Sequence, residues 1–591
     1  MRFDSHIGFF REPLGPAAAG ATLQLRFICD DATHIVVRTF QTDERAFPMR
    51  EGAHHIWEAV LDVPEKTGLL WYDFIVYHKD GTVSRYGAPE DGLGGEGRVW
   101  PDHMHAYQLT IYDPHYTTPR YMHGAVIYQI FPDRFYKAPT KAKDTRRDRE
   151  IHRMWTEDLY TGRDRTSQEN DVLEFYGGTL NGIREKLPYL KDLGVDILYL
   201  NPIFQASSNH RYDTADYSRI DPLLGTEEDL TELCRAAEGL GMRVMLDGVF
   251  SHTGEDSLYF NHFGHFPTVG AFQGPASPYY DWYTFEHYPD KYRAWWGIET
   301  LPEVRKDNPE YQEFMFNGKD GIVPRWIRAG ACGWRLDVAD ELPMSFLRKL
   351  RDSAKRCDPD AVVLGEVWED ASNKVAYGEM RCYCTGDTLD SVMNYPLRTA
   401  ILDFATGKSD AKSLVRLINH QSEVYPPQFQ YALMNLLGSH DRVRVLNMLV
   451  EAEGKDMTKY EQRHLRLSDD DYALARERYL MCLDLLCALP GCPTIYYGDE
   501  AGLTGTADPF CRRPFPWGRE DRKLQQAVRA KLQARQQDSL LRYGHMSVEA
   551  LDDDTVRIQR YFDGHADALG RKNHEKRSST FVISRKRERN A

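Results

Sequence analysis

The chain has 591 residues, a formal net charge of -15 and 42% hydrophobic residues. Because a typical domain uses roughly 100 to 200 residues, we expect several domains with ample cores. The negative charge argues against a nucleic-acid-binding protein, which needs a basic face to neutralise phosphates.

Residues 1–115 are predicted to form an N-terminal β-sandwich. Strand-like runs such as TLQLRFI, HIVVRTF, HIWEAVLDV, LLWYDFIVY and YQLTIY alternate there with turn-rich stretches. This spacing is typical of two packed antiparallel sheets. The proline-containing segment YDPHYTTPRYMHG follows and is predicted to be a linker.

Residues 116–520 are predicted to form a (β/α)8 barrel, an α/β fold, because strand-like and helical segments alternate. Thr226 begins T-E-E-D, a capping-box-like helix start, and Gly241 ends that helix before the next strand. Eight strand candidates occur, AVIYQIF, ILYLNPIF, RVMLDGVF, CGWRLDV, AVVLGEV, SVMNYP, YALMNLLGS and PTIYYG. Eight parallel strands close naturally into a barrel.

Two further segments complete the predicted architecture. Residues 253–310, after the third strand, form a long aromatic stretch that we expect to be an inserted subdomain. Residues 521–591 contain TVRIQRYF and STFVISRK and predict a short C-terminal β domain.

The cysteines and the apolar segments bear on location. The ten cysteines are scattered, and the close pair Cys382 and Cys384 lacks the two-residue gap of metal and redox motifs. The sequence shows no signal-like N-terminus and no uninterrupted apolar stretch of about 18 residues. We therefore expect reduced thiols, no membrane span and a cytoplasmic protein.

Polar residues end four of the predicted strands, where the reacting groups of a parallel barrel lie. They are Asp247 and His252 in LDGVFSH, Arg335 and Asp337 in GWRLDVADE, Glu366 in VVLGEVW, and His440 and Asp441 in LLGSHD. One buried carboxyl is more often a salt-bridge or cap partner. Four such clusters in order are harder to explain by structure alone.

The carboxyl groups of this set predict retaining glycoside hydrolysis. Arg335 and Asp337 are two residues apart, so they project to one face of a strand, where the guanidinium would keep the carboxylate ionised as a nucleophile. Glu366 lies among apolar residues, which raise a carboxyl pKa towards that of a general acid. Retaining hydrolysis uses such a pair about 5 to 5.5 Å apart. Asp441 would stabilise the positive charge of the transition state.

The neighbouring rings have two explanations each. His252 and His440 would donate hydrogen bonds to sugar hydroxyls, but each alone fits a core histidine equally well. Trp295 and Trp296 would form a stacking wall for glucosyl rings or the core of the insert.

The regions DGVFSH, GWRLDVADE, GEVW and GSHD resemble those of the α-amylase superfamily, glycoside hydrolase family 13. VIYQIFPDRF, NPIFQASSNHRYDTADY and GDEAGLTGTADPFCRRPFPW resemble its neopullulanase, cyclomaltodextrinase and amylopullulanase group. The resemblance covers nearly the whole chain. It implies the barrel, the insert, a C-terminal β-sandwich and an N-terminal module like those that bind starch.

The same resemblance implies retaining hydrolysis of α-1,4 bonds in α-glucans such as maltodextrins, pullulan, cyclodextrins or starch fragments. It leaves hydrolysis of α-1,6 bonds open. It makes Asp337 the nucleophile, Glu366 the proton donor and Asp441 the transition-state stabiliser. Substrate contacts are expected from the residues His252, Arg335, His440, Tyr212, Asp247, Asp508 and Arg512, with Tyr212 stacked beneath the reacting glucose.

Four features depart from the family pattern. Ser251 stands where an Asn often helps to bind calcium, and the stretch after PDRFYKAP lacks an Asn/Asp-rich calcium loop, so we expect no metal and no cofactor. Asp340 replaces the Asn of a V-A-N-E pattern, which leaves the preference between α-1,4 and α-1,6 bonds open. The C-terminal domain looks short for the family, so either its stability would suffer or a partner chain would cover the gap.

The sequence leaves alternatives open. A 4-α-glucanotransferase resolves the same covalent intermediate with a sugar hydroxyl instead of water. A non-catalytic glucan-binding protein would have lost a carboxylate, whereas all three are present here. The resemblance alone suggests a homodimer.

Overall fold

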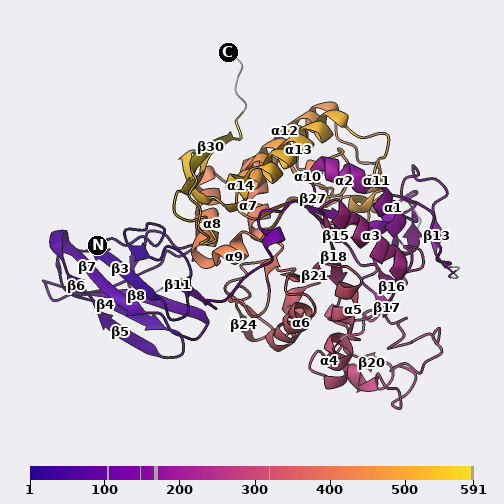
Figure 1. The fold of residues 1–591 in the computed structure, drawn as a ribbon, viewed down its shortest axis with the longest axis horizontal. Helices are drawn as coiled ribbons and strands as arrows, with labels where there is room; N and C mark the ends of the chain where they lie inside the picture. The colour runs from indigo at the N-terminus through magenta and orange to yellow at the C-terminus, as the bar shows by residue number, and fades with distance from the viewer. Residues whose placement is uncertain (103–104, 145, 147, 166–170, 319, 587–591) are drawn as a thin grey trace.

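The computed structural model describes residues 1–586 apart from 103–104, 145, 147, 166–170 and 319. A β-sandwich comes first in the chain and lies to one side of a barrel in Figure 1. None of the helices in this described part combines the length and the apolar character that crossing a bilayer requires.

The N-terminal sandwich packs two sheets face to face. One sheet has the strand order β1 (Arg11–Glu12), β3 (Thr22–Ile28), β7 (Ile56–Asp62) and β6 (Arg50–Glu51). The other has the order β10 (Arg98–Trp100), β9 (Val83–Gly87), β8 (Gly68–His78), β11 (Tyr107–Tyr112) and β2 (Ala17–Ala18), with β4 (Ala32–Phe40) and β5 (Glu44–Pro48) attached through β8. Alternate residues of β3 and β4 are buried, which is the pattern of strands with one face on a core.

The barrel contains the eight predicted strands in chain order, so the predicted fold class is confirmed. They are β12 (Ile127–Ile130), β15 (Ile197–Leu200), β18 (Arg243–Gly248), β21 (Gly333–Leu336), β22 (Val362–Gly365), β25 (Ser391–Val392), β26 (Met434–Leu436) and β27 (Cys492–Tyr496). The sheet runs β25-β22-β21-β18-β15-β12-β27-β26, all parallel. A parallel bridge between Met393 and Met434 joins its two ends.

Helices surround this barrel, as in Figure 1. They are α1 (Leu180–Glu185), α2 (Leu187–Leu193), α3 (Glu227–Gly239), α4 (Pro309–Phe316), α5 (Ile322–Arg328), α6 (Met344–Cys357), α7 (Tyr395–Thr406), α8 (Ala411–Val424), α9 (Pro427–Gln430), α10 (Val445–Met448), α11 (Lys459–His464), α12 (Asp469–Ala488), α13 (Arg522–Gln537) and α14 (Ser539–Tyr543). The predicted capping box is present, since Thr226 caps α3 through the backbone N–H of Asp229.

One connection of the barrel departs from the alternating pattern. Between β22 and β25, where every residue is described, the chain forms the hairpin β23 (Lys374–Ala376) and β24 (Glu379–Arg381) instead of a helix. This hairpin belongs to the connection that begins with Glu366.

Three C-terminal strands, β28 (His545–Asp552), β29 (Thr555–Asp563) and β30 (Lys576–Ser584), form an antiparallel sheet. Val556, Ile558 and Ile583 belong to the same hydrophobic cluster as the barrel helices, whereas the sandwich has its own core. The sandwich is tied to the barrel by an ion pair of 2.8 Å between Arg11 and Glu423 of α8, with both side chains buried.

Candidate active site

The polar residues predicted at strand ends lie together at the carboxyl end of the barrel. Asp247 is in β18, Arg335 is in β21, and Asp337 and Glu366 directly follow β21 and β22. This neighbourhood follows from parallel pairing, since β18 lies next to β21 and β21 next to β22.

The Arg335 guanidinium is the centre of the cluster. Its Nη1 lies 2.8 Å from Asp247 Oδ1 and 3.1 Å from Asp337 Oδ1. Its Nη2 lies 2.8 Å from Glu366 Oε2, a charge contact without hydrogen-bond alignment. One buried cation therefore holds three carboxyl groups within a single contact shell.

This crowding changes the expected electrostatics. Burial raises the pKa of Asp337 well above its usual range, opposed by Arg335 and reinforced by the charges of Glu366 and Asp247. Burial also raises the pKa of Glu366, again opposed by Arg335. Arg335 acts in the expected direction by lowering the pKa of Asp337, but burial outweighs it because one guanidinium is shared among three carboxyl groups. Such a cluster favours retaining a proton.

Asp247 is buried, and the hydrogen bonds described for it run to other protein groups. Tyr199 and Tyr212 donate hydrogen bonds of 2.6 and 2.9 Å to its Oδ2, while Oδ1 binds Arg335. These contacts hold Arg335 and Tyr212 in place, and the expected sugar contact from Asp247 stays a prediction.

In the part of the chain that the structure describes, Glu366 is held through its Oε2. Its Oε2 accepts a 2.9 Å hydrogen bond from the backbone N–H of Val338 and faces Arg335. Both of these contacts use Oε2, so Oε1 is left to carry a proton. Val338 itself has a φ of 35°, a strained left-handed conformation for a β-branched residue and one that occurs at functional sites.

His440 is a neutral ring with a defined tautomer. Burial lowers its pKa well below 6.5, and Arg512 and Arg335 act in the same direction. Gln129 Nε2, which can only donate, lies 2.9 Å from His440 Nδ1. The proton is therefore on Nε2, which lies 2.6 Å from Tyr212 Oη and 3.1 Å from Asp441 Oδ2.

Arg512 brings together the remaining predicted residues. Its guanidinium binds the His440 carbonyl at 2.9 Å, Asp441 at 3.4 Å and Asp508 at 3.0 Å. Asp441 is about one-third exposed and Asp508 half exposed, so both carboxylates remain accessible to a ligand.

His252 contacts protein through both ring nitrogens. Its Nε2 donates to the Tyr212 carbonyl at 3.2 Å and its Nδ1 lies 2.9 Å from Ser251 Oγ. Burial lowers its pKa to about 3, so the ring is neutral. Its described contacts orient the Tyr212 backbone, and Ser251 serves as its hydroxyl partner.

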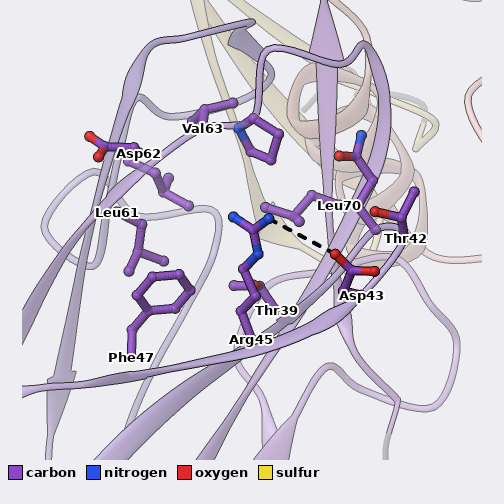
Figure 2. A pocket seen from close by; sticks show the side chains of 12 residues that line it. Thr39, Thr42, Asp43, Arg45, Phe47, Leu61, Asp62, Val63 and Leu70 are labelled. Atoms are coloured by element: carbon purple, nitrogen blue, oxygen red, sulfur yellow. Dashed lines mark ion pairs between the residues drawn. The ribbon is translucent and has the colours of Figure 1, made fainter.

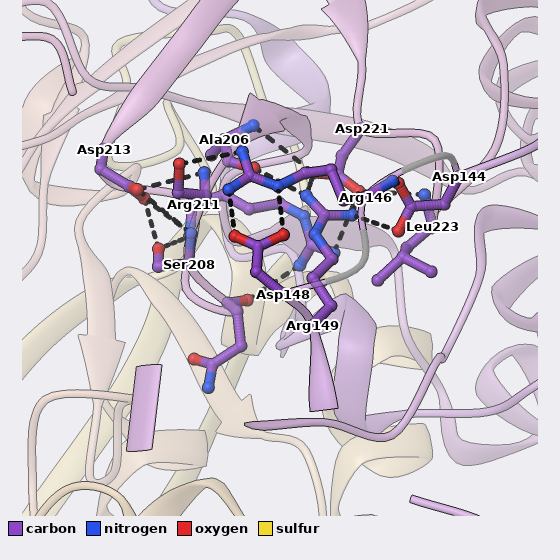
Figure 3. A network of polar contacts seen from close by, with 12 residues as sticks. Asp144, Arg146, Asp148, Arg149, Ala206, Ser208, Arg211, Asp213, Asp221 and Leu223 are labelled. Atoms are coloured by element: carbon purple, nitrogen blue, oxygen red, sulfur yellow. Dashed lines mark hydrogen bonds and ion pairs between the residues drawn. The ribbon is translucent and has the colours of Figure 1, made fainter. Parts of the chain in front are cut away.

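The loop that presents Tyr212 is held by the polar network in Figure 3. Arg149 forms two hydrogen bonds to Asp221 at 3.0 and 2.7 Å, and Asp213 accepts from the backbone N–H groups of Ser207 and Ser208. A cavity of about 610 Å³ lies beside this network and includes His210 and Asp213 in its lining. This volume falls in the range of small-molecule sites.

Aromatic rings lie beside His252 at the edge of the site, here called the rim, and they include Trp295, Trp296 and Tyr377. Trp295 lies 5.0 Å from the ring of His252, and Trp296 stacks on Trp295 at 4.6 Å. Trp296 is 70% exposed, so it is not part of the insert's core. Glu341 accepts a 2.8 Å hydrogen bond from Trp296 Nε1 and a second from Tyr377 Oη on the β23–β24 turn.

The core of the insert uses other aromatic residues. Tyr259, Trp282 and Tyr283 are buried there. The insert therefore has a core without Trp296, and the stacking of Trp295 and Trp296 on glucosyl rings stays a prediction. Asp340, the departure from the family pattern, contacts Lys374 and Tyr383 at 2.5 Å each.

Sequence reasoning missed several residues that the structure places in the site. Gln129 and Asn201 orient His440 and Tyr212, Tyr199 binds Asp247, and Glu341 and Tyr377 shape the rim. The first two interrupt the predicted strands AVIYQIF and ILYLNPIF, so the rule that found Glu366 would have found them. Tyr377 gives no such signal, because it lies on a hairpin turn.

The sandwich contains a smaller pocket, shown in Figure 2. Its volume is about 60 Å³, and Arg45 and Asp43 lie 4.0 Å apart at its edge. This is far below the roughly 300 Å³ at which small-molecule sites begin. The sandwich pocket is therefore too small to be a candidate small-molecule site.

A parallel barrel with carboxyl groups around a buried arginine at its mouth is the architecture of a glycoside hydrolase. Comparison with known families supports this class. Residues 129–546 match the alpha-amylase catalytic domain. The chain therefore belongs to the α-amylase family, glycoside hydrolase family 13.

The relatives of the chain carry the names of glucan-acting enzymes. The chain is 36% identical to amylopullulanase of Thermoanaerobacterium saccharolyticum over 96% of this chain and 47% of that protein. It is 35% identical to neopullulanase 2 of Thermoactinomyces vulgaris over 80% of this chain and 74% of that protein. The chain thus spans about half the length of the first of these relatives.

A solved structure gives the same architecture. The cyclic α-maltosyl-(1→6)-maltose hydrolase of Arthrobacter globiformis, in complex with its named ligand, superposes with a TM-score of 0.63 and 29% identity. The match covers 79% of this chain and all of that one.

Proposed function

We propose that this protein is a retaining glycoside hydrolase that cleaves α-glucosidic bonds of α-glucans. The observation that carries the proposal is the shared contact of Asp337 and Glu366 with Arg335. Retaining hydrolysis needs two carboxyl groups about 5 to 5.5 Å apart, and contact with one guanidinium keeps this pair near each other.

We assign the nucleophile role to Asp337. Its Oδ1 is held by Arg335, which leaves Oδ2 to attack the anomeric carbon and form a covalent glycosyl-enzyme. Glu366 gives its proton to the leaving oxygen and then takes a proton from the water that hydrolyses the intermediate. The reaction needs an ionised Asp337 and a protonated Glu366. Both conditions hold when the single proton shared by the pair resides on Glu366 Oε1.

The other residues take supporting roles in this proposal. Asp441 stabilises the oxocarbenium-like charge, and Arg512 orients it. Tyr212 provides the ring beneath the reacting glucose, while Asp247, His252 and His440 position Tyr212 and Arg335. We propose that this reaction uses neither a metal nor a cofactor.

Acceptor choice is the second part of the proposal. The exposed rings of Trp296 and Tyr377 offer stacking surfaces beyond the bond that is cleaved. A bound glucan hydroxyl would then compete with water for the intermediate, so a 4-α-glucanotransferase remains the second candidate. The names of the relatives favour substrates with α-1,4 and α-1,6 bonds.

We further place the protein in the cytoplasm and expect a homodimer. All ten cysteines are free thiols, which supports a reducing compartment.

A panel of pullulan, soluble starch and cyclodextrins, with sizing of the products, tests the substrate. We expect release of short maltodextrins with the α-anomeric configuration. Binding of these glucans without any release of reducing sugar would instead support a non-catalytic glucan-binding protein.

A further inference from the structure

A second cluster of chemically reactive side chains lies in the N-terminal sandwich. Cys29 follows β3, Asp31 lies in the turn before β4, and His78 ends β8. The Cys29 Sγ lies 3.0 Å from Asp31 Oδ1, and His78 Nδ1 lies 3.0 Å from Asp31 Oδ2. One ligand atom from each residue lies within 4.8 Å of the other two.

The backbone around the cluster is fixed by hydrogen bonds from three directions. The Cys29 N–H donates to the His55 carbonyl at 3.0 Å, and the Trp57 indole donates to the Cys29 carbonyl at 3.1 Å. The Asp31 carbonyl accepts from the backbone N–H of Lys79, the neighbour of His78. The backbone segments that carry the three side chains are therefore held by hydrogen bonds.

The imidazole of His78 is also oriented. Its Nε2 lies 2.8 Å from Ser84 Oγ, so Nδ1 is directed at Asp31. A second hydrogen bond of this kind is the usual support for a histidine that binds a metal. Cys29 and His78 are buried, whereas the side chain of Asp31 is 59% exposed.

We propose that Cys29, Asp31 and His78 form a binding site for a borderline-soft divalent cation of the Zn²⁺ type. Sulfur, imidazole nitrogen and carboxylate oxygen are the ligands that Zn²⁺ prefers, at about 2.0 to 2.3 Å. Tetrahedral ligands at those lengths lie about 3.3 to 3.7 Å apart, so small side-chain rotations would close the site. A thiolate and a carboxylate together balance the charge of the ion.

The ligand set argues against the hard cations. Ca²⁺ and Mg²⁺ take oxygen ligands almost exclusively, and a thiol among three donors disfavours them. The fourth position of a tetrahedral ion would face the exposed side of Asp31, where water supplies the remaining ligand.

The placement of the site suggests what the ion does. Cys29 extends from β3 of the smaller sheet, and His78 belongs to β8 of the larger sheet. An ion bound by both would link the two sheets of the sandwich at one end. This metal site takes no part in the glycoside hydrolysis proposed above. The test of the site therefore does not depend on that proposal.

The test is a titration of the full, chelator-treated chain with Co²⁺, which reports a thiolate ligand by a charge-transfer absorption. We expect one equivalent to bind with this absorption and Zn²⁺ to displace it. Cys29→Ser should lose the absorption, and Ser84→Ala should weaken affinity by about 10- to 100-fold. Zn²⁺ should also raise the unfolding temperature of the wild type but not of Cys29→Ser.

The control is Cys357→Ser, because Cys357 is the partly exposed thiol outside the cluster. It should keep the absorption and the affinity. Absence of a thiolate absorption in the wild type, or equal Co²⁺ binding by wild type and Cys29→Ser, would overturn the site. If Cys29→Ser does not fold, His78→Gln decides, since it retains the thiol and should still lose tight binding.

Discussion

The backbone N–H of Val338 donates a hydrogen bond of 2.9 Å to Oε2 of Glu366. Because Val338 directly follows Asp337, the strand end that carries one carboxyl also positions the other. The same Oε2 faces Arg335, so the orientation of Glu366 depends on β21 as much as on its own strand.

Substitution of Glu366 should affect substrates unequally. Glu366→Gln removes the proton donor, and we expect hydrolysis of maltotriose to fall by about 10³-fold or more. A substrate with an acidic phenol as leaving group needs no protonation, so formation of its glycosyl-enzyme should fall far less. Burst-phase release of the phenol and steady-state kinetics measure the two effects.

Asp337→Ala provides the contrast, because loss of the nucleophile should abolish hydrolysis of both substrates. Glu369→Gln, an exposed neighbour in the same loop, should retain activity. An equal loss on both substrates for Glu366→Gln would contradict its role as the proton donor.

The rim aromatics should influence transfer more than hydrolysis. Trp296→Ala removes an exposed ring that stacks on Trp295. We expect products longer than maltotriose to form about 2- to 10-fold more slowly, the equivalent of about 0.5 to 1.5 kcal/mol of stacking. Early product sizing with maltotriose measures this. Val375→Ala on the adjacent hairpin is the control, and an identical product pattern for Trp296→Ala would exclude an acceptor role.

Glu500 should make stability depend on pH. Burial raises its pKa to about 7, while Tyr128 and Tyr189 donate hydrogen bonds of 2.6 Å to it. The unfolded chain releases this proton near pH 4.5. The contribution of Glu500 to the free energy of unfolding is therefore fully present below pH 4.5. It is lost as the pH rises through 7, and the total loss is about 3 kcal/mol.

In Glu500→Gln we expect the free energy of unfolding to fall less between pH 5 and pH 8 than in the wild type. Denaturant unfolding at both pH values measures the difference. Glu228→Gln, an exposed glutamate, should retain the dependence of the wild type. The prediction fails if Glu500→Gln retains it as well.

The buried pair between the sandwich and the barrel should matter more than an exposed one. Glu423→Gln leaves the fully buried Arg11 without its charge partner, and we expect a loss of about 3 to 5 kcal/mol. Glu58→Gln breaks a partly exposed pair with Arg26 on the same sandwich, for which we expect at most about 1 kcal/mol. Urea denaturation compares the two, and equal losses would refute the argument.

The eight barrel strands and the residues at their ends could be predicted because they depend on local pattern. Apolar runs of strand length define the barrel, and a polar residue that ends such a run faces its mouth. This rule located Asp337, Glu366 and His440 from the sequence by itself.

Contacts between distant segments could not be predicted in this way. Asp31 and His78 are 47 positions apart, and only the packing of two sheets brings them together. The pKa of Asp337 depends likewise on how many carboxyl groups share Arg335. Such contacts and pKa shifts arise from three-dimensional proximity and burial. The order of residues along the chain does not report either one, so only the tertiary structure decided them.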